Sequence, residues 1–421
     1  MRFLHLADIH LDAPFATLDP SLRGRLRAAA REAFENAVDL ALEEDVHAVL
    51  VAGDLFHGGH ISFATERFLL DQVQRLEEKG KRIVYTTGNH DPHGGSRPGR
   101  PFPWPANVTV IGTEEPVTVE IAGENGRTVG RVTGAGHGSS RVTRDLSRTF
   151  PRPAEDLPHV GLLHTQVGGA REAGEHHPYA PSDLRHLRGS GFGYWALGHI
   201  HRRQTLSSDP PIHYPGCLMG LDPGERGPKG GLLVDLGRRG DPQVEFRSLA
   251  PVRWEEVEIS GLGEIRSLDG LVRAIARTWK DHLGEEGGGS PEPGPASGWL
   301  LRVLLAGPTP LWREFRSREN LAELEDVVRE DLGLLRARIR AEATAPPVAP
   351  GEFLEREDVL GEALRLLRDL RSGRTRLPPD WITNLASTEI LGTKTEDLDL
   401  EELLREADRE LTARMTTEDE G

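Results

Sequence analysis

Five short polar motifs limit what this chain can fold into, because each follows a run of apolar residues. A short apolar run that stops at a turn is typical of a buried strand. Side chains placed directly after parallel strands collect at one edge of the sheet. We therefore expect the five motifs to face a common cleft. They are Ala7-Asp8-Ile9-His10, Gly53-Asp54-Leu55-Phe56-His57, Gly88-Asn89-His90-Asp91, His164 and Gly198-His199-Ile200-His201.

The side chains in these motifs form a mixed set of metal ligands. Carboxylate oxygens, an asparagine oxygen and several imidazole nitrogens suit Mn²⁺, Fe²⁺, Zn²⁺ or Co²⁺ and suit Ca²⁺ poorly. In an extended backbone, residues i and i+2 point to the same side, so Asp8 and His10 can reach one cleft, as can His199 and His201. Asp54 has two oxygens and can bridge two cations, which is what a two-metal hydrolytic site needs.

His90 is placed to act on a substrate rather than to bind metal. It stands between Asn89 and Asp91. An imidazole in such a place can donate a proton or a hydrogen bond, and a neighbouring carboxylate can orient it. Any one of the five motifs alone is more often an ordinary strand end. It is the combination of five in one context that indicates a metal centre.

The order of the expected elements predicts a parallel sheet with helices on its faces. Apolar runs at 3–7, 48–52 and 82–86 alternate with stretches of helical apolar spacing at 21–45 and 62–78. Further along, a series of short strands predicts a second, more antiparallel sheet. The expected fold class is α/β, a layered α/β/β/α sandwich with a small α+β accessory domain and a helical C-terminal tail.

The chain, at 421 residues, exceeds one ordinary domain. We expect a catalytic domain over 1–250, an α+β accessory domain over 251–345 and a helical, acidic region over 346–421, which begins at a proline-rich break. Within the last region, residues 353–370 and 398–411 carry apolar side chains at helical spacing. Such helices could dock on a partner or cover the accessory domain.

The net charge of −16 is concentrated near the C-terminus. Residues 351–421 carry 19 acidic against 10 basic side chains, whereas residues 1–250 carry 31 against 28. Residues 1–250 are nearly neutral, so bound divalent cations could make the local electrostatic potential positive. Composition therefore does not exclude nucleic acid as a ligand. No apolar run is long enough to span a membrane, and the first residues lack the apolar region of a signal peptide. We expect a cytoplasmic protein, and the single Cys217 fits a reducing compartment.

In this order and with these spacings, the motifs resemble the calcineurin-like metallophosphoesterase superfamily. The sequences around Asp8, Asp54 and Asn89 look like those of DNA-repair exonucleases of the SbcD type, and Asp12-Ala13-Pro14-Phe15 looks closest to the YhaO-like branch. The similarity covers residues 1–250 strongly and the remainder only by domain layout. It implies a metallophosphoesterase sandwich that hydrolyses phosphodiester bonds in DNA as an exonuclease, with endonuclease activity also open.

The resemblance also implies two bound divalent metal ions, with Mn²⁺ favoured over Fe²⁺, Zn²⁺ and Co²⁺, and a role for each motif residue around them. One metal would be held by Asp8, His10, Asp54 and His201, and the second by Asp54, Asn89, His164 and His199. The non-ligand residues would be His90, which stabilises the developing charge or protonates the leaving oxygen, Asp91, which fixes the tautomer of His90, and His57, which helps to position the substrate phosphate.

DNA as substrate rests on the resemblance more than on the residues. The interleaving of aromatic and basic residues that is typical of single-strand platforms is absent. Arg141, Arg144, Arg148 and Arg152 would line one face if helical and could contact a phosphate backbone, but a solvated face is an equal alternative. The resemblance implies a coiled-coil ATPase partner of the SbcC or YhaN kind and leaves a homodimer open. Two alternatives remain: a phosphodiesterase or phosphatase for nucleotides or small phosphoesters, and a DNA- or ATPase-binding scaffold with a slow or inactive metal site.

Overall fold

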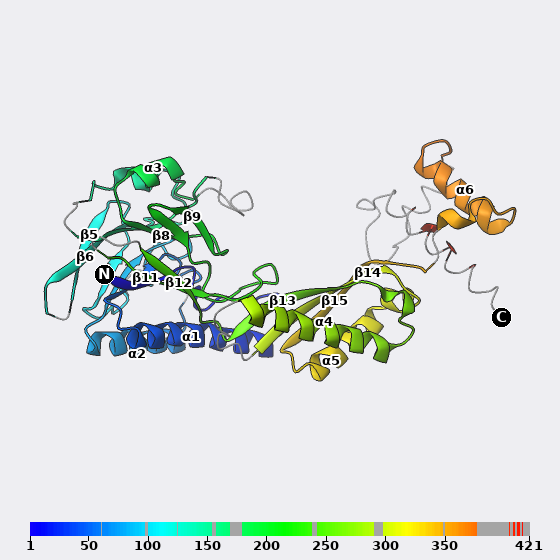
Figure 1. Cartoon of the computed structure of the whole chain (residues 1–421), viewed down its shortest axis with the longest axis horizontal. Helices are drawn as coiled ribbons and strands as arrows, with labels where there is room; N and C mark the ends of the chain where they lie inside the picture. Colours follow the sequence, from blue (N-terminus) through cyan, green and yellow to red (C-terminus); the bar gives the residue numbers. More distant parts are fainter. Residues whose placement is uncertain are drawn as a thin grey trace. The chain divides into compact units, whose positions relative to one another are not determined.

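The computed structural model of the chain (Figure 1) divides into two compact units. The first consists of Met1–Glu255 and Glu285–Leu300, and the second of Glu256–Gly284 and Leu301–Gly421. The residues that the structure describes are 1–59, 61–96, 100–123, 125–153, 157–168, 179–237, 242–289, 298–347 and 350–376, with isolated positions at 404, 407, 408, 411, 412 and 415.

The first six-stranded sheet of the first unit carries most of the motifs. Its four strands β1, β2, β3 and β4 are parallel neighbours, with Leu4 opposite Val49 and Val49 opposite Ile83. Two antiparallel strands, β11 and β12, extend it beyond β1. In spatial order the strands are β12 (Gln243–Ser248), β11 (Gly230–Asp235), β1 (Arg2–Leu6), β2 (Ala48–Ala52), β3 (Arg82–Thr86) and β4 (Val108–Ile111).

The second six-stranded sheet is parallel at its centre, where we expected a more antiparallel one. The pairs β6·β7, β7·β8 and β8·β10 are parallel, and only the outer pairs β5·β6 and β9·β10 are antiparallel. Apolar runs mark strands but not the direction in which distant strands pair, which is why this expectation was wrong. In spatial order the strands are β5 (Val117–Ala122), β6 (Thr128–Ala135), β7 (His159–His164), β8 (Tyr194–Gly198), β10 (Pro211–Tyr214) and β9 (Gln204–Ser208).

Helices cover the outer sides of the two sheets. Figure 1 shows α1 (Pro20–Glu43) and α2 (Phe63–Glu78) on one side and α3 (Leu184–Gly189) on the other. The start of α1 is fixed because Asp19 accepts a hydrogen bond from the Leu22 N–H at 3.0 Å and Pro20 occupies the first turn. Ser62 caps α2 in the same way through the Thr65 N–H. A 3₁₀ turn, η1 (Leu146–Thr149), precedes β7.

The main core lies between the two sheets. Strand alternation sends Phe3 and Leu50 of the first sheet and Leu162 of the second into this layer, where all three are fully buried. The neighbouring side chains Leu163 and Trp195 face the opposite way and pack in a separate cluster with Leu187 of α3. The expected layered α/β/β/α sandwich is confirmed.

The third sheet, most of which belongs to the second unit, has its strands in the order β13 (Val252–Ile259), β14 (Gly298–Pro308), β15 (Arg336–Ala345). Helix α5 (Arg318–Asp331) buries Leu324 and Val328, and its Glu325 accepts the backbone N–H of Ile339 in β15 at 2.9 Å. The remaining elements are α4 (Leu268–Gly289), α6 (Val359–Arg371) and the 3₁₀ turns η2 (Leu262–Glu264), η3 (Glu314–Arg316) and η4 (Pro350–Phe353).

The two C-terminal helices expected from sequence have different outcomes. Most of the first, expected over 353–370, is present as α6, whereas most of 398–411 lies outside the described residues. None of the helices in the described ranges combines the length and the apolar character needed to cross a lipid bilayer.

Candidate metal centre

Backbone hydrogen bonds tie together the loops that follow β1 and β2. The N–H groups of Ile9 and His10 both donate to the Asp54 carbonyl, at 2.9 and 3.0 Å, and that of Leu11 donates to the Leu55 carbonyl at 2.9 Å. The backbone here is left-handed rather than extended, with φ of 50° at Asp8, 49° at His10 and 51° at Asp54. Our reason for placing Asp8 and His10 on one side, strand alternation, was therefore wrong. A pair of left-handed residues brings them to the same place instead.

Asp8, His10 and His201 form the first group of donors. One ligand atom from each lies within 4.8 Å of the others. The Nε2 atoms of His10 and His201 are 3.1 Å apart, and His201 Nε2 is 3.8 Å from Asp8 Oδ1. The Asp8 carboxylate also accepts the backbone N–H of His199 at 3.0 Å, which ties the loop after β8 to the loop after β1.

The second group gathers around Asp54 and Asn89. His164 Nε2 lies 3.4 Å from Asp54 Oδ2 and 2.9 Å from Asn89 Oδ1, and His199 Nδ1 lies 3.2 Å from the same Asn89 oxygen. Asp54 Oδ2 is also 3.8 Å from His10 Nε2, so this carboxylate stands between the two groups. The structure thus brings together all seven residues that we expected to bind metal.

The hydrogen bonds of His164 indicate that its Nε2 atom, which faces the cluster, carries no proton. Its Nδ1 donates to the carbonyl of Ala52 at 2.9 Å, and a carbonyl can only accept. Burial, followed by the charges of His199 and His137, keeps the pKa of His164 well below its usual value, so the ring is neutral and its Nε2 carries a lone pair. That lone pair faces oxygen atoms of Asp54 and Asn89, an arrangement that a cation would stabilise.

The buried carboxylates give a second sign that cations belong here. Burial raises the pKa of Asp8 to about 7, with further contributions from the charges of Glu225 and Asp91. Burial, then the charges of Asp91 and Asp8, raise the pKa of Asp54 well above its usual value. Acidic groups so close together are costly to ionise unless a cation offsets them, and this mixed oxygen and nitrogen set fits first-row divalent ions.

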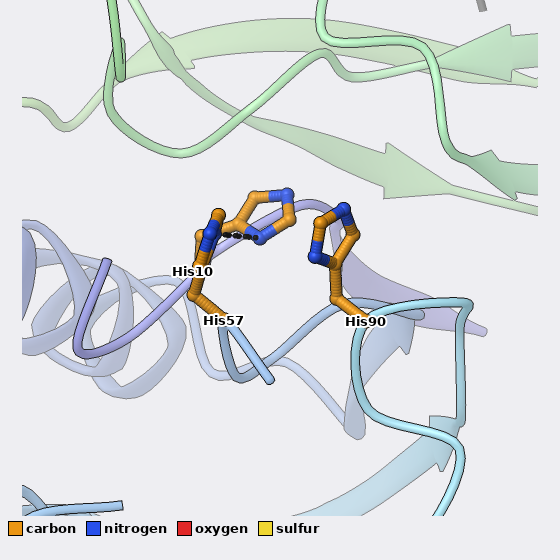
Figure 2. Close-up of side chains that lie close together, drawn as sticks. All are labelled: His10, His57 and His90. Atoms are coloured by element: carbon orange, nitrogen blue, oxygen red, sulfur yellow. Dashed lines mark hydrogen bonds between the residues drawn. The ribbon is translucent and has the colours of Figure 1, made fainter. Parts of the chain in front are cut away.

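Three imidazoles meet at the exposed side of the centre (Figure 2). His57 Nδ1 is 3.2 Å from His10 Nδ1, and the exposed His90 ring lies 4.9 Å from the ring centroids of both. Partial burial, followed by the charges of His57 and His201, lowers the pKa of His90 to about 4. His90 is therefore a neutral imidazole near pH 7, which favours hydrogen-bond donation over transfer of a full proton.

Asp91 has a place different from the one we expected. Its Oδ1 accepts the Gly88 N–H at 2.7 Å, and its Oδ2 accepts the Phe56 N–H at 3.1 Å and the hydroxyl of Tyr85. Among the described residues the carboxylate forms no hydrogen bond or ion pair with the His90 ring, so it does not fix the tautomer of that ring. It holds the loops after β2 and β3 together instead.

The sequence did not reveal Glu225, which orients His201. Glu225 Oε1 accepts a hydrogen bond from His201 Nδ1 at 2.5 Å, while Oε2 accepts the backbone N–H of Leu221 at 2.7 Å. This bond leaves His201 Nε2 facing His10 and Asp8. A carboxylate behind a ligating histidine fixes its tautomer and ring orientation. No motif includes Glu225, which lies in a loop rich in glycine and proline.

The arginines at 141–152 do not form the helical face that we considered. Residues 141–145 are not helical, and the only regular element nearby is the short turn η1. Arg144 pairs with Glu114 at 2.5 Å and Arg148 with Asp145 at 3.2 Å. These charges are partly neutralised by neighbouring carboxylates.

Comparison with known proteins agrees with this geometry. Residues 1–203 match the model of the calcineurin-like phosphoesterase family. The chain is also 30% identical over 334 residues to a Bacillus subtilis protein named "Uncharacterized metallophosphoesterase YhaO", covering 78% of each chain. The chain belongs to the calcineurin-like phosphoesterase family. The resemblance inferred from the motifs is confirmed, and the protein is a metal-dependent phosphoesterase.

Two further relatives of this phosphoesterase have names that describe an activity. It is 27% identical over 424 residues to "DNA double-strand break repair protein Mre11" of Methanopyrus kandleri, covering 90% of this chain and 84% of the relative. It is 28% identical over 291 residues to the D component of the SbcCD nuclease of Rhodobacter capsulatus, covering 58% of this chain and 68% of the relative. The family binds two divalent metal ions, and the two donor groups described above are the candidate ligands in this chain.

Proposed function

We propose that this phosphoesterase is a two-metal DNA exonuclease, with Mn²⁺ as the preferred ion. One observation carries the proposal: lone pairs of His164, Asp54 and Asn89 face one another beside a second donor group, with Asp54 standing between the two. The Mre11 and SbcCD relatives, named for DNA repair and nuclease activity, support DNA as the substrate. The same proposal includes three regions: a catalytic region over 1–250, an accessory region over 251–345 and a partner-docking region over 346–421.

The roles of the side chains follow from where they lie. When bound, the two cations would polarise a phosphoryl oxygen and make a water molecule acidic enough to attack phosphorus. Asp8, His10 and His201 would hold one side of the centre, and Asn89, His164 and His199 the other, with Asp54 shared between them. The Ala52 carbonyl and the Glu225 carboxylate orient the rings of His164 and His201 by accepting hydrogen bonds from their Nδ1–H groups. These acceptors keep the Nε2 atoms directed at the centre.

His90 and His57 would act on the phosphodiester itself. His90 is exposed beside His10 and, being neutral, can donate a hydrogen bond to the leaving oxygen as charge develops there. His57 lies against the same two rings and can hold a second phosphoryl oxygen. Asp91 supports both from behind, because it binds the backbone at Phe56 and Gly88.

The test is hydrolysis by the purified chain with Mn²⁺ of end-labelled DNA, bis(p-nitrophenyl) phosphate and nucleotides. We expect DNA to be degraded from its ends, and Asn89→Ala and His90→Ala to abolish degradation. His93→Ala is the matched control, because His93 is an exposed histidine three residues beyond His90. Turnover of small esters alone would overturn DNA as substrate, and tight metal binding without any turnover would favour a scaffold.

A coiled-coil ATPase of the SbcC or YhaN kind is the partner that we propose on the basis of the resemblance. Helix α6 is the described candidate for docking, since Val359 and Leu366 are exposed on it at 72% and 51%. Co-purification of the full chain from its own cells would identify the partner. Recovery of the chain without any such ATPase would contradict this part of the proposal.

A further inference from the structure

A pocket with a volume of about 200 Å³ lies beside the metal centre, on the far side of His201. The described residues that line it all belong to the first unit, and His201 belongs both to the pocket and to the first donor group. The His201 Nε2 side faces His10 and Asp8, whereas the Nδ1 side meets Glu225 in the pocket wall. One imidazole ring therefore separates the two spaces. The lining residues are His201, Arg202, Gly224, Glu225, Arg226 and Lys229.

The lining of this pocket is cationic. Among the residues that the structure describes, it includes Arg202, Arg226 and Lys229 and one carboxylate, that of Glu225. Both oxygens of Glu225 are already engaged, Oε1 by His201 and Oε2 by the Leu221 N–H. The carboxylate is thus directed to His201 and the surrounding backbone, which leaves the Lys229 ammonium as the buried charge that an anion in the pocket could meet.

Lys229 is the residue that most directly indicates a ligand. It is only 9% exposed, yet among the described residues the one hydrogen bond of its Nζ is a long one, 3.4 Å, to the His201 carbonyl. An ammonium group has three donors, and buried charges are normally paired. Burial raises the pKa of Glu225, whereas the charges of His201 and Lys229 help to lower it below its usual value, but the two described side chains Lys229 and Glu225 form no ion pair. Lys81, which is equally buried at 9%, shows the usual arrangement, since it forms an ion pair with Asp45.

We propose that this pocket is a subsite for a second phosphate group of the substrate, next to the phosphate held at the metal centre. The inference rests on the proposed function, because it assumes that a phosphodiester is bound at the centre. It narrows the substrate class to molecules with at least two phosphates, either a nucleic-acid backbone or a nucleoside polyphosphate. Lys229 would bind the second phosphate from the floor of the pocket, and Arg202 and Arg226 from its rim.

The test measures binding to the full-length protein by calorimetry, with Mn²⁺ bound and with His90→Gln in place so that hydrolysis is slow. One set of probes is dithymidine with its single internal phosphate, and the same molecule with an added 5′- or 3′-phosphate. The other set is thymidine 5′-monophosphate and 5′-diphosphate. We expect the added phosphate to tighten binding by on the order of tenfold, as one charge-assisted hydrogen bond does.

Variants locate this gain in the pocket. Lys229→Gln should abolish the gain, and Lys81→Gln, a change at an equally buried lysine just before β3, should retain it. If Lys229→Gln does not fold, the exposed Arg226→Gln takes its place, with Arg127→Gln on the β5–β6 turn as its control. A gain in the dithymidine set identifies a nucleic-acid backbone, and a gain confined to the diphosphate identifies a nucleoside polyphosphate.

Two results would overturn the subsite: no gain from any added phosphate, or a gain that persists in Lys229→Gln or Arg226→Gln. Neither result depends on turnover, so the outcome stays separate from that of the DNA hydrolysis assay. If DNA is not degraded but the added phosphate still tightens binding through Lys229, the exonuclease proposal fails and the pocket remains an anion site.

Discussion

Replacing Glu225 by glutamine should weaken one metal site and spare the other. The two imidazoles that face the centre through Nε2 are oriented by different groups, His201 by the Glu225 carboxylate and His164 by the Ala52 carbonyl. The two carboxylate oxygens of Glu225 accept hydrogen bonds from His201 Nδ1 and from the Leu221 N–H. In Glu225→Gln a single amide oxygen is left to accept one of these two bonds. His201 then loses a charged acceptor, whereas His164 keeps its own.

The size of the effect follows from that lost bond. A hydrogen bond to a charged group contributes about 1.5–3 kcal/mol. Each 1.4 kcal/mol is about tenfold in an equilibrium constant. We therefore expect the ion held by His201 to bind roughly 10 to 100 times more weakly, the range that loss of a residue behind a metal ligand usually gives.

Calorimetric titration of the metal-stripped protein with Mn²⁺ measures both sites. Wild type should bind two ions, and Glu225→Gln should bind one of them with unchanged affinity and the other roughly 10 to 100 times more weakly. Asp222→Asn is the control, because Asp222 is an exposed carboxylate on the same loop that accepts the Gly224 N–H, at 2.7 Å. Two unchanged sites, or an equal loss at both in a variant that melts like wild type, would refute the reasoning.

Three further predictions concern the same centre. His90→Gln should lower turnover by about 10²- to 10⁴-fold while two Mn²⁺ ions still bind, because His90 contacts substrate rather than metal; steady-state kinetics and metal analysis check this. Gly53→Ala should lower the melting temperature and lose one ion, since a Cβ there would lie 2.2 Å from His164 Nδ1 at a φ of +85°, as a thermal melt and metal analysis would show. Mn²⁺ affinity should rise with pH, because two ligands, Asp8 and His201, must release protons to bind the ion. Burial raises the pKa of Asp8 to about 7. Burial lowers the pKa of His201, but the charges of Glu225 and Asp8 outweigh burial and raise that pKa to about 9. Titrations in buffers of different ionisation enthalpy count those protons.

The sequence predicted that the expected ligand side chains lie together, because each motif is local. A ligand directly after an apolar strand needs only the strand and its neighbours to be recognised, and parallel order then brings Asp8, Asp54 and Asn89 to one edge. The reason that we gave for the pair at Asp8 and His10 failed, since nothing in the sequence shows that a residue other than glycine adopts a positive φ. The surrounding hydrogen bonds impose that conformation.

Residues whose role depends on distant partners were harder to predict. Glu225 lies 24 positions from His201, and no spacing rule links a carboxylate in a loop to a histidine after a strand. Asp91 was assigned to His90 because the two are adjacent in sequence, but its carboxylate turns back to Phe56, Gly88 and Tyr85. Strands β9 and β10 are harder to recognise in the sequence, because β10 has only four residues and β9 is mostly polar, so neither has a long apolar run.

The hydrogen bonds between the loops after β1 and β2 affect how the protein binds its metal ions. Since Ile9, His10 and Leu11 are held to the Asp54 and Leu55 carbonyls by backbone alone, the entropy of ordering these loops is lost when the chain folds, not when a cation arrives. The centre is therefore preorganised. Ion uptake should be fast and reversible, in contrast to small zinc domains that are unfolded until metal binds them.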